Sequence, residues 1–184
     1  MTTADKGSET NVARAFIQKA RQLLTEEYLP KIERCVEKLT DEQVWWRPNP
    51  ESNSIGNLML HLSGNARQWI VCSLGGATDE RQRQTEFDER RIIPRAELLT
   101  RLRTTVANVD EVLRDFDPAR LLQNYPIQGT EATALEAIFH VTEHFSMHTG
   151  QIILLAKMLA NIDLVFYDFS TGKPVHTWQE SRPV

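Results

Sequence analysis

Residues 133–160 read TALEAIFHVTEHFSMHTGQIILLAKMLA, the most apolar helical pattern in the chain. Its leucine, isoleucine, valine and phenylalanine residues predict a helix of about these bounds. Because a helix that is apolar nearly all round is normally a buried one, we expect this helix in the core. The pattern also contains three of the five histidines of the chain, His140, His144 and His148. Four residues make about one helical turn, so these side chains should follow one face of the helix.

Three further segments have apolar residues near the helical period, over residues 12–39, 55–74 and 94–116. Pro30 interrupts the first of them, and we expect a kink or a short break there. The segments are separated by connections rich in proline, glycine or charge, among which residues 77–91 form a long and exposed one. Four long helices without convincing strands predict an all-α fold. We expect a four-helix bundle with a long connection between its second and third helices.

The two ends of the chain carry weaker signals. Residues 1–11 are polar, lack the apolar stretch of a signal peptide, and are expected to form a flexible N-terminus. Residues 163–184 show little periodicity, and we expect an irregular C-terminal tail that packs back on the helices. Residues 12–184 are therefore assigned to a single domain.

The composition excludes several classes of protein. A formal net charge of −4 and the lack of a basic run with aromatic residues argue against a nucleic-acid partner. No apolar run approaches the length of about 20 residues that a membrane span requires, so no membrane association is expected. Two cysteines, Cys35 and Cys72, do not make a disulfide framework, which favours a reducing, cytoplasmic location.

Amide and imidazole side chains gather in stripes on two of the predicted helices. The stripes comprise Asn57, His61, Asn65 and Gln68 on the second helix, and His140, His144, His148 and Gln151 on the fourth. Such a stripe can simply face water, but solvent-facing stripes normally carry lysine, glutamate and arginine. A histidine pair on one helix and a single histidine on a facing helix would bind a divalent cation and leave coordination positions open.

The spacing of the histidines does not choose the pair. Three histidines at steps of four span about 12 Å of helix axis, too long for all of them to reach one ion. Either His140 with His144, or His144 with His148, satisfies the geometry.

Residues 54–65 read SIGNLMLHLSGN and residues 144–152 read HFSMHTGQI. These two segments resemble the DinB/YfiT-like superfamily of metal-dependent proteins. Members of that superfamily pair one histidine of the second helix with His-x-x-x-His followed by Gly-Gln-Ile. The sequences WWRP at residues 45–48 and FYD at residues 166–168 resemble one bacterial branch of it. The resemblance covers about residues 14–169.

This resemblance implies a four-helix bundle with a divalent metal ion bound by His61, His144 and His148. His140 then lies outside the ligand set, as a residue that packs beside it or supports it. Relatives in the superfamily include enzymes that act with low-molecular-weight thiols such as bacillithiol or mycothiol. The resemblance therefore also implies a thiol as a substrate.

The predicted function is metal-dependent nucleophilic chemistry, either thiol S-transfer by a transferase or hydrolysis. Neutral imidazoles suit several metals; we expect zinc or nickel, with iron or manganese as alternatives. The partners expected are a small-molecule substrate and a second copy of the chain in a homodimer. The main rival is a non-catalytic metal-binding or stress-response bundle, and a third interpretation is a structural dimer whose histidines are incidental.

Other residues rank lower as candidates for a functional site. His176 lies alone in the C-terminal tail and is expected to be exposed. Glu86, Asp88 and Glu89 belong to the charged connection, where carboxylates are usually solvated, although a loop over the site could supply a base. Asn57, Asn65 and Gln151 are the residues expected to orient the metal ligands.

Overall fold

The computed structural model describes the backbone of residues 3–178 and the side chains of residues 10–178. It is mostly helical, and its strands are short. The long helices and the turns that extend them are α1 (Thr3–Gln22), a π-helical turn (Leu23–Tyr28), α2 (Leu29–Glu37), α4 (Ile55–Ala66), a second π-helical turn (Arg67–Cys72), α6 (Arg95–Asp115) and α7 (Ala134–Ala160). The short helices are α3 (Asp41–Trp45), α5 (Arg83–Asp88) and a 3-10 turn (Pro118–Arg120).

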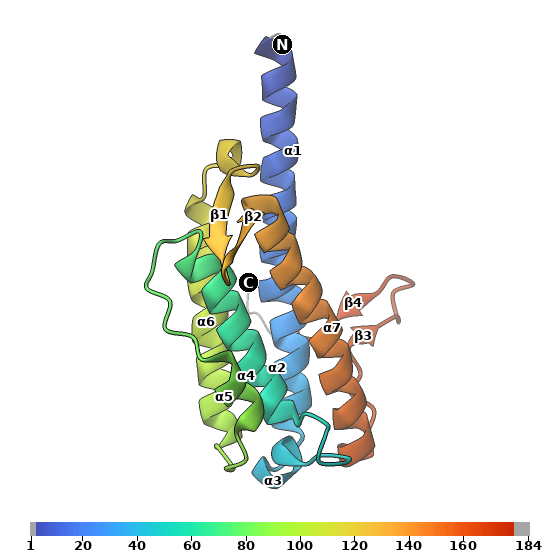
Figure 1. The fold of residues 1–184 in the computed structure, drawn as a ribbon. Helices are drawn as coiled ribbons and strands as arrows, with labels where there is room; N and C mark the ends of the chain where they lie inside the picture. Colours follow the sequence, from blue (N-terminus) through green and yellow to red (C-terminus); the bar gives the residue numbers. More distant parts are fainter. Residues whose placement is uncertain (1–2, 179–184) are drawn as a thin grey trace.

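The long helices lie side by side along the molecule (Figure 1). Helix α4 packs against α6 on one flank and α7 on the other, while α2 contacts both α6 and α7. The expected all-α class is confirmed. The long connection expected after the second helix is also present, over residues 73–94, and α5 lies within it.

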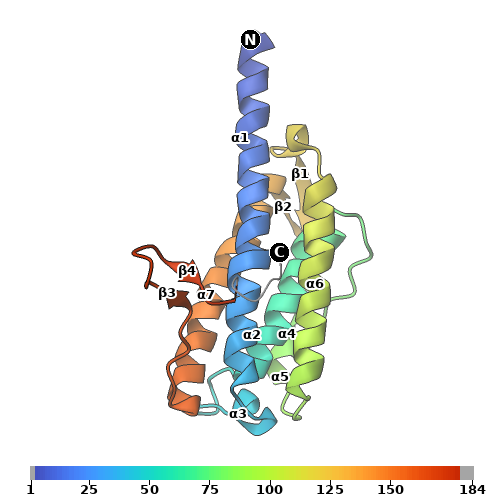
Figure 2. The same ribbon diagram turned by 180° about the vertical axis from the view of Figure 1, so that it is seen from behind.

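Pro30 lies in the first turn of α2, and the disturbance that it causes lies just before it. The N–H of Leu29 donates to the carbonyl of Leu24, five residues back, which is the hydrogen bond of a π-helix. Figure 2 shows α1 continuing into α2. The helix therefore changes its hydrogen bonding ahead of the proline without ending, so the short break that we allowed for is absent.

Two short hairpins correct the expectation of a chain without strands. The first consists of β1 (Asn124–Ile127) and β2 (Thr130–Thr133), which pair antiparallel just before α7. Its turn is formed by Gln128 and Gly129, both at positive φ. The strands are four residues long, too short for an alternating pattern to stand out in the sequence.

The second hairpin corrects the expectation of an irregular C-terminal tail. Strands β3 (Tyr167–Asp168) and β4 (Val175–His176) pair antiparallel, and residues 179–184 of the expected tail lie outside the described residues. The prediction that His176 is exposed is wrong. Its side chain is 15% exposed, its Nε2 lies 2.8 Å from a carboxylate oxygen of Glu27, and its ring stacks on Trp178.

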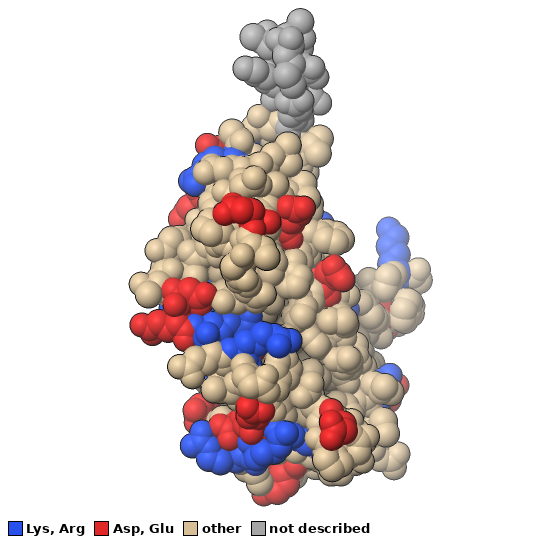
Figure 3. Space-filling model, in the orientation of Figure 1, with Lys and Arg blue, Asp and Glu red and all other residues tan. Residues whose placement is uncertain are grey.

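Helix α7 is buried on one face only, although its sequence is apolar nearly all round. The buried residues include Val141, Phe145, Ile152 and Ala156. On the opposite side four large apolar side chains are 49% to 62% exposed: Phe139, Met147, Leu154 and Met158. Figure 3 shows few charged residues along this helix. The prediction that α7 is fully buried is therefore wrong for this face.

The first helix begins at Thr3 and so reaches into residues 1–11, which we expected to be a flexible N-terminus. Residues 1–2 lie outside the described part of the chain, and the domain boundary at residue 12 stays a prediction. Among the helices described, none is both long and apolar enough to cross a membrane. Cys35 and Cys72 are buried free thiols.

Candidate metal site

Helix α4 carries His61 to the middle of the molecule. The helix begins after Ser54, whose hydroxyl accepts a hydrogen bond from the N–H of Asn57, while the Asn57 side chain accepts one from the N–H of Ser54. This reciprocal pair fixes the start of the helix. Most of the side chains of α4 are buried, because α6 and α7 cover it on both flanks. His61 is accordingly only 4% exposed.

Helix α7 supplies the other two histidines. It begins at a second reciprocal cap, between Thr133 and Glu136, and ends at Asn161, which adopts the left-handed conformation. Between these caps the helix runs without interruption, so His144 and His148 stand one turn apart on the edge that faces α4.

The three rings of His61, His144 and His148 direct the same atom toward one another. The Nε2 of His144 lies 2.7 Å from the Nε2 of His61 and 3.2 Å from the Nε2 of His148. One ligand atom from each ring lies within 4.8 Å of those of the other two. The predicted residues therefore lie close together, in an arrangement that is compatible with a metal site.

The outer nitrogens of two of the rings have partners that determine which nitrogen carries the proton. The Nδ1 of His61 lies 2.9 Å from Glu86 Oε2, and the Nδ1 of His148 lies 2.6 Å from Gln151 Oε1. Both partners are acceptors, so each Nδ1 is the donor and each Nε2 keeps a free lone pair. These lone pairs belong to the atoms that converge. Metal-binding histidines are typically held by such partners.

The surroundings also keep two of the imidazoles, those of His144 and His148, neutral. Burial first, and then the neighbouring His148, His61 and His140, lower the pKa of His144 from its ordinary 6.5 to about 3. Burial likewise lowers the pKa of His148. Because only the neutral ring has a lone pair to offer, both residues remain available as ligands in mildly acidic solution.

Glu86 was predicted from the sequence to be solvated in a charged connection, and this prediction is wrong because its carboxylate belongs to the site. It is 8% exposed and accepts hydrogen bonds from Arg81 Nε at 2.7 Å and from Arg81 Nη2 at 2.8 Å. Burial raises the pKa of Glu86, but the hydrogen bonds from Arg81 and His61, together with the charge of Arg81, outweigh burial and hold that pKa below its usual range. The ionised carboxylate is therefore an integral part of the site. Asp88 is exposed, as expected, and Glu89 is partly buried.

His140 lies beside the group and outside it. Its Nε2 is 3.1 Å from the Nδ2 of Asn65, and its ring packs on Trp69 at a centroid distance of 4.1 Å. Its ring centroid is 5.1 Å from that of His144.

The three amide residues expected to orient the ligands have different contacts. Asn65 supports His140. Gln151 contacts His148 of the group, and the Asn57 side chain holds the backbone carbonyl of Glu86 at 2.8 Å.

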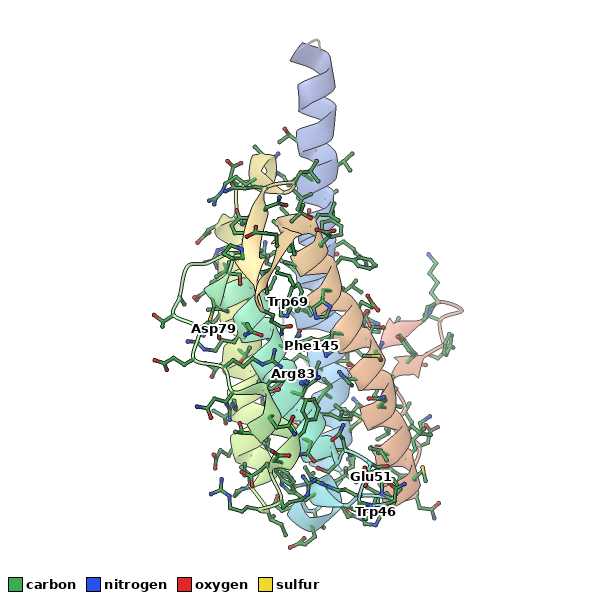
Figure 4. The ribbon with its side chains drawn as sticks, viewed as in Figure 1. Trp46, Glu51, Trp69, Asp79, Arg83 and Phe145 are labelled. Carbon is green, nitrogen blue, oxygen red and sulfur yellow. The ribbon has the colours of Figure 1, made fainter. Side chains whose placement is uncertain are left out.

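A hollow of about 330 Å³ lies beside Gln151. Leu58 of α4 and Leu154 and Leu155 of α7 form its apolar wall, and Pro48 and residues 51–53 line its other side. Figure 4 shows Trp46 and Glu51 at this end of the molecule. Its connection to the histidine group is Gln151, which contacts the Nδ1 of His148, and no histidine is among its lining residues.

The lowered pKa of His144 predicts an acid-sensitive stability for the metal-free protein. Below pH 6.5 His144 binds a proton in the unfolded chain, whereas in the folded chain it stays neutral until the pH approaches about 3. The contribution of His144 to stability is therefore complete above pH 6.5 and is lost progressively as the pH falls toward 3. Urea unfolding should give a smaller free energy of unfolding at pH 5 than at pH 7. The difference should shrink in His144→Gln, and an equal free energy at both pH values would contradict this prediction.

Comparison with known proteins identifies a family and a solved structure that the chain resembles. Residues 11–173 match a family model described as protein of unknown function (DUF1572). Among solved structures, the chain is similar to a conserved protein from Enterococcus faecalis, with a TM-score of 0.67 and 15% sequence identity. The match covers 79% of this chain and 97% of the other, and at this identity it shows a common fold. The comparison with curated proteins found no match.

Proposed function

We propose, from the premise that the chain belongs to the DUF1572 family of proteins of unknown function, that His61, His144 and His148 bind one divalent metal ion. The observation that carries this proposal is the convergence of three Nε2 atoms, two of which have their lone pairs freed by hydrogen bonds at Nδ1. A set of three neutral imidazoles fits zinc and nickel best, and iron or manganese are the alternatives.

We infer that the site serves a metal-dependent enzyme. His61, His144 and His148 would hold the ion with coordination positions left open, and the chemistry it would supply is that of a Lewis acid toward a water or thiol nucleophile. Glu86 and Gln151 hold two of the ligand rings in position. The hollow beside Gln151 would accept the substrate, with its leucines against an apolar portion of that molecule.

The finer identity of the protein is part of this proposal. We infer a DinB-like four-helix bundle that carries out thiol S-transfer or hydrolysis in the cytoplasm, with a low-molecular-weight thiol as the expected substrate. The supporting observations are the histidine group and the arrangement of α1 with α2, α4, α6 and α7. A metal-binding bundle without catalysis is the alternative.

Metal analysis followed by an activity screen tests the proposal. The protein is purified without nickel affinity, and its metal content is measured by mass spectrometry. About one zinc or nickel ion per chain is the expected result, and a protein that neither contains nor takes up such an ion would refute the proposal. The loaded protein is then screened for thiol transfer with bacillithiol, mycothiol, glutathione and coenzyme A. Metal binding without turnover of any substrate favours the non-catalytic alternative.

The exposed apolar face of α7 supports the expected homodimer. Contiguous exposed apolar side chains on a helix commonly mark an interface between proteins. Replacement of Met158, which is 62% exposed, by lysine should convert the dimer to a monomer in light scattering. Leu122→Lys, at a residue that is 75% exposed outside this face, is the control and should remain dimeric. A wild-type protein that is monomeric at all concentrations would refute the homodimer.

A further inference from the structure

Helix α4 has room for Glu86 beside His61 because residue 64 is a glycine. A Cβ at Gly64 would lie 1.9 Å from a carboxylate oxygen of Glu86 and 2.9 Å from Arg81 Nε. Gly64 follows His61 by three residues, so it lies on the same side of the helix, about one turn on. Any larger residue at this position would occupy the space that the Glu86 carboxylate now fills.

The same carboxylate joins the long connection to the histidine group. Arg81 and Glu86 both come from this connection, and their side chains are only 5% and 10% exposed. The Arg81 guanidinium uses Nε and Nη2 on the two oxygens of Glu86, and its Nη1 donates to Gln68 Oε1 on the second π-helical turn. The Nδ1 of His61 has two neighbours. It lies 2.9 Å from Glu86 Oε2 and, farther away, 3.3 Å from Arg81 Nη2. Glu86 is therefore the hydrogen-bond partner of His61.

The backbone of the connection is anchored on α4 as well. The side-chain amide of Asn57 donates, through its Nδ2, to the backbone carbonyl oxygens of Glu86, at 2.8 Å, and Glu89, at 3.2 Å. His61 also packs against Phe87, with ring centroids 4.6 Å apart. The segment that carries Glu86 thus docks on α4 through its backbone, a ring and a buried ion pair.

We propose that Gly64, Arg81 and Glu86 form a latch that positions His61 for metal binding and couples metal binding to the docking of residues 79–88. This inference rests on the proposed function. Glu86 holds the His61 ring with Nδ1 protonated, Arg81 holds the carboxylate in place, and Gly64 leaves the space for it. The three are positioning residues and do not themselves contact the ion.

The coupling follows from reciprocity between the two events. If the docked connection strengthens metal binding by fixing His61, then metal binding must strengthen docking by the same factor. Partners of metal-binding histidines typically contribute about 10- to 100-fold to metal affinity. We therefore expect backbone amides of residues 79–88 to exchange with deuterium more slowly in the zinc-loaded protein than in the metal-free protein.

Two matched pairs of variants test the latch by competition titration with zinc and a chelating dye. Glu86→Gln removes the carboxylate, and the exposed Glu80→Gln removes the same charge from the same connection. Gly64→Ala fills the space for the carboxylate, whereas Gly150→Ala places a methyl group where nothing lies within 4 Å. Glu86→Gln and Gly64→Ala should each weaken zinc binding by about 10-fold or more. The two controls should bind as the wild type does.

A folded Glu86→Gln variant with the zinc affinity and the amide exchange of the wild type would overturn the proposal. Since this substitution leaves the buried Arg81 charge without its partner, the double variant Arg81→Gln/Glu86→Gln provides a second measurement if the single variant does not fold. It should show the same loss of affinity.

The ring nitrogens of His61 provide a readout that does not require metal. Nitrogen-15 NMR of the metal-free protein should find His61 protonated at Nδ1 in the wild type. In Glu86→Gln it should find a mixture of the tautomers protonated at Nδ1 and at Nε2. If the wild type binds no zinc, the proposed function fails, and this spectrum still decides the role of Glu86. A wild-type His61 that is protonated at Nε2 would overturn the latch.

Discussion

His144→Ala should abolish stoichiometric binding of zinc or nickel. Its Nε2 is the central atom of the group, because it lies within 3.2 Å of the Nε2 atoms of both His61 and His148. Loss of this ring leaves two nitrogens on different helices, and the affinity should fall by more than the roughly 100-fold that a supporting residue can contribute. Equilibrium dialysis followed by elemental analysis measures the bound metal. His144 is only partly buried, so the variant should remain folded by circular dichroism.

The remaining histidines make this prediction specific. His176→Ala should keep the metal, since His176 is held by Glu27 and Trp178 in the C-terminal hairpin. His140→Ala should also keep it, because its Nε2 faces Asn65. If His140→Ala lost the metal while His148→Ala retained it, the chosen pair would be wrong although a metal site exists. If the triple replacement of His61, His144 and His148 left the metal content unchanged, the site hypothesis would fail.

The fold class could be predicted because its signals are local. Caps, glycines and the helical period lie within a few residues of one another along the chain, so α4, α6 and α7 could be placed from the sequence. The spacing of His144 and His148 is local too, which is why one helical face could be expected for them. Spacing left His140 with His144 as an equal choice. The resemblance to a known superfamily favoured the pair that lies with His61 in the structure.

What the sequence did not reveal depends on contacts between distant segments. Glu86 reaches His61 across 25 residues of chain, and nothing in a run of charged residues distinguishes the buried carboxylate from its exposed neighbours. A glycine three residues after a candidate ligand was the available signal, since it leaves room for another group beside the helix. The exposure of His176 was predicted wrongly for the same reason, because its partner Glu27 lies far away in the sequence, in the π-helical turn between α1 and α2. The exposed face of α7 was missed because apolar residues alone do not distinguish a buried face of a helix from an exposed one.

Phe145→Ala should lower the free energy of unfolding more than any other substitution considered. It tests the contribution of α7 to the core, whereas the histidine variants test its contribution to metal binding. Phe145 is fully buried, and Figure 4 shows it in the middle of the molecule. Truncation of such a ring leaves a cavity and typically costs about 3–5 kcal/mol of the free energy of unfolding. That loss is a large fraction of the roughly 5–15 kcal/mol that stabilises an ordinary domain. Urea unfolding of the metal-free protein measures it.

Phe139→Ala is the matched control, on the same helix and six residues earlier. Its ring is 57% exposed, so its loss should change the free energy of unfolding by less than about 0.5 kcal/mol. Because Phe139 belongs to the face proposed for the homodimer, both variants are compared with the wild type over a series of protein concentrations. A cost of Phe139→Ala that grows with concentration reports on the interface, whereas the cost of Phe145→Ala should be the same at every concentration. Equal and concentration-independent losses for the two rings would show that the burial assigned to α7 is wrong.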